Sequence, residues 1–265
     1  MSVIQEIIAY KKIELPHLKT QLQDFKVQHM GGFSPQAKSL LEKLRSKEKC
    51  FIFEIKPSSP ALGVIQHNLD VEALITAYEK HAVAISVLTD TRYFGGSFAL
   101  LERCALLTQK PLLCKDFIVD ELQLDLAQKS GATAVLLIVK SLTDSKLAEL
   151  YKKALQRGLL PFVEVNDMHE VHCALEINPD IILINNRNLD TLEIDMENTS
   201  KIVGLIPSDI AVISASGIST PEHVEKLSKY SSNFLVGSSL MVAPVNELES
   251  KIKVLVGGKN GFDTP

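Results

Sequence analysis

Charged and polar side chains stand at or just after the ends of several apolar runs in this 265-residue sequence. The clearest case is the run 51–56, which reads FIFEIK and is stopped by Pro57, because proline cannot donate to a β-ladder. Lys115, Glu164 and Asn185 close further runs of the same kind. Lysine and glutamate exchange protons and hold charged ligands, so a fold that gathers these residues creates a site suited to acid–base chemistry.

The run 51–56 has the alternation of a β-strand. Successive side chains of a strand point to opposite faces, so Glu54 and Lys56 share a face with Ile52, and the other apolar residues share the second face. Removing a charge from water costs several kcal/mol unless the charge is paired. The pair is therefore either a structural ion pair or part of a ligand site. Taken singly, Lys115 and Glu164 could likewise be either structural charges or parts of a ligand site. Their common position at strand ends favours a ligand site.

The elements that must position these residues repeat along the chain. Eight apolar segments predict strands, at 51–56, 83–88, 111–115, 134–139, 160–165, 181–184, 210–214 and 233–236. A helix-like segment follows each strand, and helix-starting residues stand at Ser97, Asp120, Thr143, Asp167 and Thr220. Eight alternations of strand and helix predict a (β/α)8 barrel. An open doubly wound sheet is the alternative, but no GxGxxG motif follows the first strand.

Two helices are expected before the first strand. Apolar spacing in residues 4–22 predicts an amphipathic helix that Pro16 breaks, and Ser34-Pro35 marks the start of a second helix that ends near Arg45. We therefore expect a TIM barrel with an N-terminal helical extension that covers one of its ends. The expected boundaries are 1–48 for the extension, 49–256 for the barrel and 257–265 for a flexible tail.

Composition excludes several classes of function. The net charge of −4 gives no indication of binding to nucleic acid or to an anionic membrane. Four cysteines form no CxxC pair and no His/Cys cluster, which predicts a reduced, cytoplasmic protein without a metal site. No apolar run reaches the roughly 20 residues of a membrane span, and the first residues lack the apolar stretch of a signal peptide. We expect a monomer or a weak homo-oligomer.

Glycines and small polar residues follow the last two strands. In a (β/α)8 barrel the active site lies where the strands end. Ser216-Gly217 follows the seventh strand and Gly237-Ser238 follows the eighth, and the backbone N–H groups of such turns suit a phosphate. Phe94 and Phe117 follow the second and third strands, where a single aromatic residue is more often core than ligand contact. Together, these strand ends predict a site for a phosphorylated small molecule.

The order of the motifs resembles a known family, the indole-3-glycerol phosphate synthases. The resemblance runs from about residue 2 to 256 and is carried by FEIK (53–56), SSP (58–60), GVI (63–65), ISVLTD (85–90), YFGGS (93–97), PLLCKDFIVD (111–120), Gln123, GA (131–132), LLI (136–138), VEV (163–165), INNRNL (184–189), SASGI (214–218) and LVGSSLM (235–241). Any one of these motifs is weak evidence. Their number and their order are specific.

The resemblance implies a carbon–carbon lyase, a carboxy-lyase, of tryptophan biosynthesis. Its substrate would be 1-(2-carboxyphenylamino)-1-deoxyribulose 5-phosphate, which undergoes ring closure, loss of carbon dioxide and loss of water to give indole-3-glycerol phosphate. The resemblance implies neither cofactor nor metal, which agrees with the absence of a cluster with metal-ligand spacing in the sequence.

The resemblance also assigns roles to residues. The catalytic set that it implies is Lys115 as general acid, Glu164 and Glu54 as the proton-transferring carboxylates, Lys56 and Asn185. Which carboxylate performs which transfer stays open. The substrate-binding set that it implies is Ser59 for the carboxylate, Phe94, Phe117 and Leu136 for the aromatic ring, Arg187, and Ser216, Gly217, Gly237 and Ser238 for the phosphate.

One position departs from the family pattern. The family usually has Ser-Glu-Ser-Gly-Ile after the seventh strand, and this chain has Ala215 in place of the glutamate. We expect activity to survive, because Lys115, Glu54 and Glu164 are present. Two alternatives stay open: a ligand-binding relative with impaired catalysis, and another phosphate-binding barrel such as phosphoribosylanthranilate isomerase.

Overall fold

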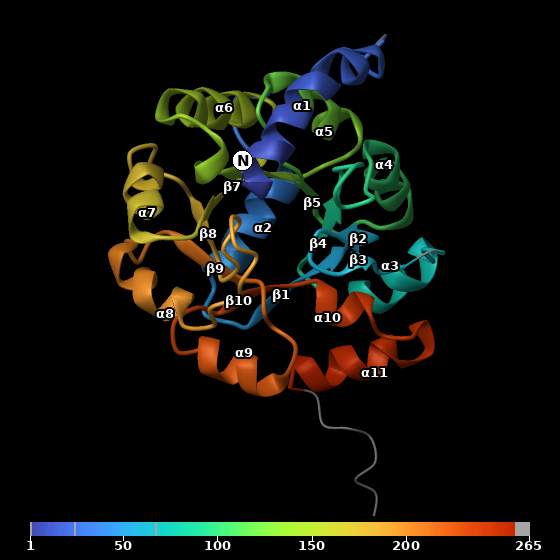
Figure 1. Ribbon diagram of the computed structural model, residues 1–265, viewed down its shortest axis with the longest axis vertical. Coiled ribbons are helices and arrows are strands. Elements are labelled where there is room, and N and C mark those ends of the chain that lie inside the picture. Colours follow the sequence, from blue (N-terminus) through green and yellow to red (C-terminus); the bar gives the residue numbers. More distant parts are fainter. Residues whose placement is uncertain (1, 24, 67, 258–265) are drawn as a thin grey trace, which may run out of the picture.

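The computed structural model describes residues 2–23, 25–66 and 68–257, and its central feature is a closed barrel of parallel strands in the order β1-β10-β9-β8-β7-β6-β5-β4 (Figure 1). The strands are β1 (Cys50–Ile55), β4 (Ala84–Leu88), β5 (Leu112–Lys115), β6 (Ala134–Ile138), β7 (Leu160–Val165), β8 (Ile181–Asn185), β9 (Ala211–Ala215) and β10 (Asn233–Val236). Each expected strand is confirmed to within one residue at either end. The (β/α)8 barrel is confirmed, and the open sheet is excluded.

Helices surround the strands on the outside of the barrel (Figure 1). They are α3 (Val71–Glu79), α4 (Phe98–Leu107), α5 (Glu121–Lys129), α6 (Asp144–Gln156), α7 (Met168–Leu175), α8 (Asn198–Ile202), α9 (Pro221–Leu227), α10 (Ser238–Met241) and α11 (Val245–Leu255), with short 3-10 turns η1 (Val139–Ser141) and η2 (Val203–Leu205). The expected helix starts are confirmed. The side chains of Ser97, Asp120, Thr143, Asp167 and Thr220 each accept a hydrogen bond from a backbone N–H in the first turn.

Successive side chains of a strand point to opposite faces, so each strand contributes to two apolar clusters. On β1, Phe53 and Ile55 pack against the surrounding helices, whereas Ile52 faces the interior of the barrel. On β5 and β7, Leu113 and Phe162 likewise face the interior. The next inward position toward the carboxyl end of each strand is therefore the one that reaches the mouth of the barrel.

Helix α1 (Val3–Thr20) lies at the mouth, where Val3, Ile4 and Ile7 border the cavity described below. The expected break at Pro16 is wrong, because the helix continues to Thr20. Proline removes the N–H that would bond the carbonyl of residue 12. Both positions lie on the exposed face of the helix, so water can satisfy that carbonyl.

Helix α2 (Pro35–Arg45) closes the opposite end of the barrel. Its apolar face packs on the first residues of the strands, among them Cys50 and Ala211, and the side chain of Asn233 donates to the carbonyl of Leu44 at 2.9 Å. The expected extension thus covers both ends of the barrel, one with each helix. The expected tail, apart from Gly257, lies outside the described residues.

A small hairpin that the sequence did not predict follows β1. Its strands are β2 (Ser58–Ser59) and β3 (Gly63–Val64), which pair antiparallel. The hairpin brings Ser59 and Leu62 to the mouth of the barrel. Among the helices of the described ranges, none is both long enough and apolar enough to cross a membrane.

Candidate active site

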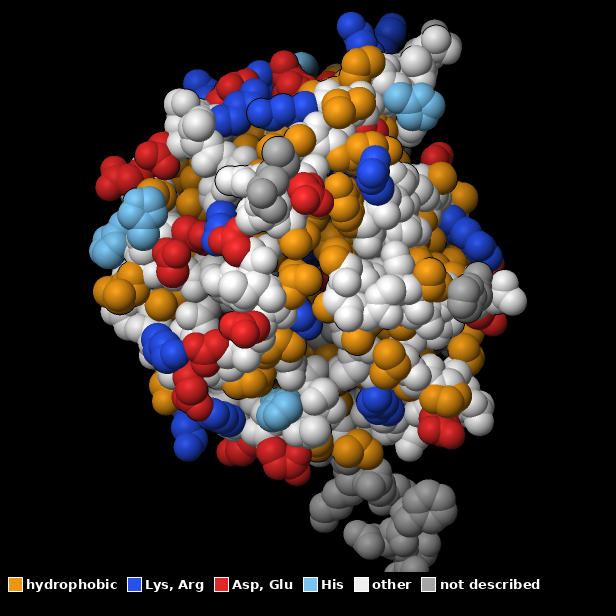
Figure 2. Space-filling model, in the orientation of Figure 1, with side chains coloured by type: hydrophobic (Ala, Val, Ile, Leu, Met, Phe, Trp, Pro, Cys, Tyr) orange, Lys and Arg blue, Asp and Glu red, His pale blue; other side chains and the backbone are white. Residues whose placement is uncertain are grey.

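A cavity of about 460 Å³ opens at the carboxyl ends of the strands. Figure 2 shows hydrophobic side chains gathered around the hollow at the centre of this face. Thirteen of the fourteen predicted site residues line it, namely Glu54, Lys56, Ser59, Phe94, Lys115, Phe117, Glu164, Asn185, Arg187, Ser216, Gly217, Gly237 and Ser238. Seven of the eight barrel strands, or the segments that directly follow them, contribute to this set, which explains why it is dispersed along the sequence.

Leu136 is the predicted site residue that the structure does not bring to the cavity. It is fully buried in the interior of the barrel, in the apolar layer beneath the site. Ile138 lies two residues nearer the carboxyl end of β6, on the same face of the strand, and lines the cavity in its place. The sequence prediction identified the correct strand and face but placed the contact one layer too deep.

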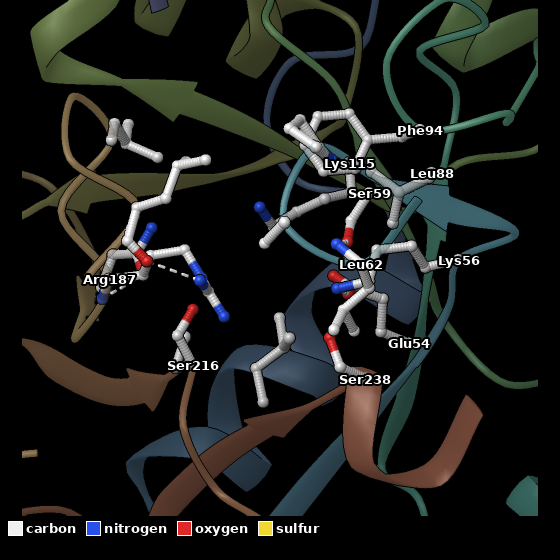
Figure 3. Close-up of a pocket in the computed structure, with 18 of the residues that line it drawn as sticks. Glu54, Lys56, Ser59, Leu62, Leu88, Phe94, Lys115, Arg187, Ser216 and Ser238 are labelled. Carbon is white, nitrogen blue, oxygen red and sulfur yellow. Dashed lines mark hydrogen bonds and ion pairs between the residues drawn. The ribbon is translucent and has the colours of Figure 1, made fainter. Parts of the chain in front are cut away.

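Glu54 and Lys56 form an ion pair on one side of the cavity (Figure 3). The Nζ atom of Lys56 lies 2.9 Å from Oε1 of Glu54, and the carboxylate is almost completely buried. Burial alone would raise the pKa of Glu54, but the charges of Lys56 and Lys115 outweigh it and hold the pKa below its usual range. Glu54 is therefore an anion at neutral pH.

Lys115 points into the cavity from the end of β5 (Figure 3). Its Nζ lies 3.4 Å from Oε2 of Glu164, and the side-chain amide of Asn185 donates to the other oxygen of that carboxylate at 2.9 Å. Burial alone would lower the pKa of Lys115, but Glu164 and Glu54 outweigh it and raise the pKa above its usual value. The lysine is thus a cation that can donate a proton to a ligand in the cavity.

Arg187 faces the cavity from the side opposite Glu54 and Lys56 (Figure 3). Its Nη1 donates to the carbonyl of Leu192 at 2.6 Å, and its backbone N–H donates to Oδ1 of Asn185 at 3.0 Å. Partial burial lowers the pKa of the guanidinium, and within the described part of the chain no carboxylate forms an ion pair with it. An anionic group of a ligand can supply that partner.

The turns after β9 and β10 bring backbone to the lower side of the cavity. Ser216 and Gly217 both have positive φ, at 71° and 81°, which turns the chain sharply after β9. Gly237 lies so close to Glu54 that a Cβ atom at residue 237 would stand 2.3 Å from the carboxylate oxygen. The absence of a side chain at residue 237 therefore leaves room for Glu54. The residues of both turns line the cavity, where their backbone N–H groups could bind an anion.

The structure adds wall residues that sequence reasoning missed. Val3, Ile4 and Ile7 of α1 and several branched apolar residues of the loops, such as Leu62 and Ile194, line the cavity. The amphipathic pattern of residues 4–22 gave the helix and its apolar face. It could not give the surface that this face covers, because that surface is assembled from loops distant in the sequence.

Ala215 also lines the cavity and is 4% exposed. It is the last residue of β9 and pairs with Asn185 on one side and Leu235 on the other. Its methyl group therefore stands at the rim of the site, where it packs with the apolar residues inside the barrel and not against an outer helix.

The carboxylates of the site pair with lysines. Within residues 2–23, 25–66 and 68–257, no three His, Cys, Asp or Glu side chains are arranged to hold a metal ion. The chemistry open to this arrangement is proton transfer at a ligand with an apolar body and anionic ends, held between Lys115, the Glu54–Lys56 pair and Arg187.

Comparisons with known proteins agree with this geometry. The family model described as indole-3-glycerol phosphate synthase matches residues 4–255. The chain belongs to the indole-3-glycerol phosphate synthase family. The indole-3-glycerol phosphate synthase of Staphylococcus haemolyticus is 40% identical over 259 residues, which cover 96% of this chain and 97% of that protein. The family resemblance read from the motifs is therefore confirmed.

Some relatives in the family are longer than this chain. The tryptophan biosynthesis protein TrpCF of Helicobacter pylori is 38% identical over 242 residues, which cover 91% of this chain but 52% of that protein. The chain thus spans about half the length of such relatives. Among solved structures, a thiamine phosphate pyrophosphorylase from Pyrococcus furiosus aligns with a TM-score of 0.57 at 19% identity, over 80% of this chain and 97% of that one. That likeness shows the barrel fold alone.

Proposed function

We propose that this chain catalyses the synthesis of indole-3-glycerol phosphate from 1-(2-carboxyphenylamino)-1-deoxyribulose 5-phosphate, as a carboxy-lyase. The observation that carries the proposal is the position of Lys115, a partly buried cation held by Glu164 and facing an apolar cavity. The substrate has an aromatic ring, a carboxylate and a phosphate, and the cavity offers an apolar wall with cations and backbone N–H groups around it.

In the first step the ring carbon that carries the carboxylate attacks the ketone of the sugar chain. Lys115 donates a proton to the ketone oxygen, which becomes a hydroxyl, and the new carbon–carbon bond closes the five-membered ring. The carbon–carboxylate bond then breaks, carbon dioxide leaves, and its electron pair restores the aromatic ring through the nitrogen.

In the second step the hydroxyl leaves as water and the nitrogen proton is removed. The adjacent ring CH2 group then loses a proton and the nitrogen regains one, which forms the C=C bond and the N–H of the indole. A carboxyl group that has first taken up a proton from solvent protonates the leaving hydroxyl, and a carboxylate takes the nitrogen proton. Glu54 and Glu164 both line the cavity, and each pairs with a lysine that also lines it. We assign these two transfers to them as a pair, with Asn185 orienting Glu164 through its hydrogen bond of 2.9 Å.

The binding roles follow the shape of the cavity. We place the aromatic ring of the substrate against Phe94 and Phe117, whose ring centroids lie 6.0 Å apart, and its carboxylate near Ser59 and Lys56. We place the phosphate at the turns 216–217 and 237–238. Arg187 supplies charge on the opposite side of the cavity.

The deciding experiment is to add this substrate to the purified chain and to follow the fluorescence of the indole product. Turnover that depends on enzyme concentration supports the proposal. Tight binding without turnover indicates a ligand-binding relative with impaired catalysis, and turnover of phosphoribosylanthranilate alone indicates the isomerase. Either result contradicts the proposal. We propose in addition that the enzyme works in the cytoplasm, without cofactor or metal, as a monomer or a weak homo-oligomer.

A further inference from the structure

Lys11 of α1 is a buried cation outside the cavity, with a side chain only 1% exposed. Its Nζ lies 2.8 Å from Oδ1 of Asp116, 3.0 Å from Oδ2 of Asp90 and 3.1 Å from Oε2 of Glu14. Burial alone would lower the pKa of Lys11, but these carboxylates outweigh it and raise the pKa, so the ammonium stays charged. A charge buried at this cost needs its partners.

Asp90 connects Lys11 to one aromatic side chain of the cavity. Asp90 is fully buried at the end of the β4 segment, and its Oδ1 accepts hydrogen bonds from the backbone N–H of Tyr93 at 2.7 Å and of Phe94 at 3.1 Å. These bonds close the turn that carries Phe94. The position of Phe94 in the cavity wall therefore depends on the position of the Asp90 carboxylate.

Asp116 connects Lys11 to the second aromatic side chain. Its Oδ1 accepts from the backbone N–H of Phe117 at 2.8 Å, and its Oδ2 accepts from the hydroxyl of Thr89 at 2.9 Å. Asp116 also directly follows Lys115 in the chain. The ammonium of Lys11 thus joins the loop after β4 and the loop after β5 through the two carboxylates that bind the backbone of Phe94 and Phe117.

Lys11 holds its own helix to these loops. Ile4 and Ile7 precede it by seven and four residues, so the three side chains lie along the same face of α1. Ile4 and Ile7 line the cavity, whereas Lys11 does not. The ion pairs are therefore placed to hold the first turns of α1 as the third side of an apolar wall.

We propose that Lys11 is a positioning residue for the reaction, whose ion pairs with Asp90 and Asp116 hold α1, Phe94 and Phe117 together as the wall that receives the aromatic ring of the substrate. This inference rests on the proposed function for its substrate. The assembled wall itself can be tested without turnover.

The test compares Lys11→Met with a matched control, Arg157→Met. Arg157 is also a buried cation, with a side chain 5% exposed, and it pairs with Asp125 at 2.5 Å and with Glu121 at 3.3 Å. It lies just before β7 begins, at the end of the barrel opposite the cavity. Lys11→Met leaves two fully buried carboxylates without their cation, and Arg157→Met removes a buried cation from Asp125 and the more exposed Glu121, so both should lower the melting temperature.

Only the Lys11 variant should change substrate binding. We expect Lys11→Met to raise KM by about tenfold or more with a smaller change in kcat, because the variant removes binding that the ground state and the transition state share. Arg157→Met should leave KM at the wild-type value. Equal KM values in the two variants and the wild type, with a lower melting temperature in both, would overturn the proposal. Should Lys11→Met fail to fold, Lys11→Gln keeps a hydrogen-bond donor and is expected to raise KM in the same direction.

Hydrogen exchange gives a readout that needs no activity. In Lys11→Met, the backbone amides of residues 3–14 should exchange faster than in the wild type, whereas Arg157→Met should leave them unchanged. Unchanged exchange in Lys11→Met overturns the positioning role even if the wild type is active. If Lys11→Met exchanges faster but the wild type shows no turnover, the positioning role of Lys11 is supported and the proposed function is contradicted. The two failures are therefore distinguishable.

Discussion

Lys115 of β5 and Glu164 of β7, two strands with β6 between them, lie with 3.4 Å between Nζ and Oε2. Glu164 is 2% exposed, and Lys115 is the more accessible of the two, so the lysine presents its charge to the cavity while the carboxylate supports it from within. Because the second carboxylate, Glu54, also raises the pKa of Lys115, the cation is fixed before any substrate enters.

Replacing Lys115 with alanine should nearly abolish turnover while substrate still binds. A general acid acts mainly in the transition state, so we expect kcat to fall by about 10²–10⁴-fold with KM changed much less. Single-turnover and steady-state fluorescence assays measure both quantities. Lys146→Ala, at a partly exposed position on α6, is the control and should behave as the wild type. A Lys115→Ala enzyme with wild-type kcat would remove Lys115 from the role of acid.

The alkaline limb of the pH profile should report the charge of Glu54. Its negative charge helps to raise the pKa of Lys115, so the protonated acid persists to a higher pH than an ordinary lysine would. In Glu54→Gln that contribution is lost, the pKa of Lys115 falls, and the alkaline limb of kcat/KM should move to lower pH. An alkaline limb that stays in place while the rate falls would show that the titrating group is not Lys115.

Gly237→Ala should disturb catalysis by displacing Glu54. The added Cβ would stand 2.3 Å from Oε1 and 3.1 Å from Cβ of Glu54, so the carboxylate must move away from Lys56. Misplacement by about 1 Å can reduce a rate by about 10²-fold. Gly204→Ala is the matched control, because nothing lies within 4 Å of a Cβ at that position. Equal rates for the two variants would argue against a role for the position of Glu54.

Most residues of the candidate site could be predicted from the sequence, because the alternation of side chains along a barrel strand determines which of them face the interior. Once Leu113 is assigned to the interior, Lys115 must reach the mouth, and the same step of two leads from Phe162 to Glu164. The same rule does not fix the layer, and the family resemblance assigned Leu136 to the cavity, where Ile138 lies instead. Depth depends on the tilt and stagger of neighbouring strands, which periodicity within one strand does not contain.

The helix α1 was the part that sequence could not place. Its apolar stripe contains Lys11, which lies on the buried face with Ile4 and Ile7. A lysine on the buried face of an amphipathic helix is the signal that could have pointed to a buried ion pair. The partners Asp90 and Asp116 come from two loops about 80 and 100 residues further along the chain, which no local pattern relates to this helix.

Inorganic phosphate or sulfate should bind between the turns 216–217 and 237–238. Ser216 and Gly217, which both have positive φ, line the cavity together with Gly237 and Ser238, and the backbone N–H groups of such turns suit an anion. A crystal soaked in sulfate should show the anion there, and phosphate should inhibit competitively with the substrate. An anion that occupies Arg187 and leaves both turns empty would assign the phosphate subsite to the other side of the cavity.

Ala215→Glu should alter catalysis without a large loss of stability. Residue 215 ends β9 and lines the cavity, so the new carboxylate can meet Lys56 or Lys115 instead of being stranded in the core. An opposite charge within about 4–6 Å favours the charged form of its partner. If the partner is Lys115, its pKa should rise further and the alkaline limb of kcat/KM should move to higher pH, opposite to the shift expected for Glu54→Gln.

The same variant separates a cavity-facing carboxylate from a buried one. An unpaired buried charge would lower the free energy of unfolding by several kcal/mol, which would appear as a large drop in melting temperature. A paired carboxylate at the rim should leave the melting temperature close to that of Ala215. Measuring the melting curve and the pH profile together is decisive, because a carboxylate that pairs with Lys115 should move the profile while the fold holds. A large drop in melting temperature with an unmoved profile would contradict the position of residue 215 at the rim.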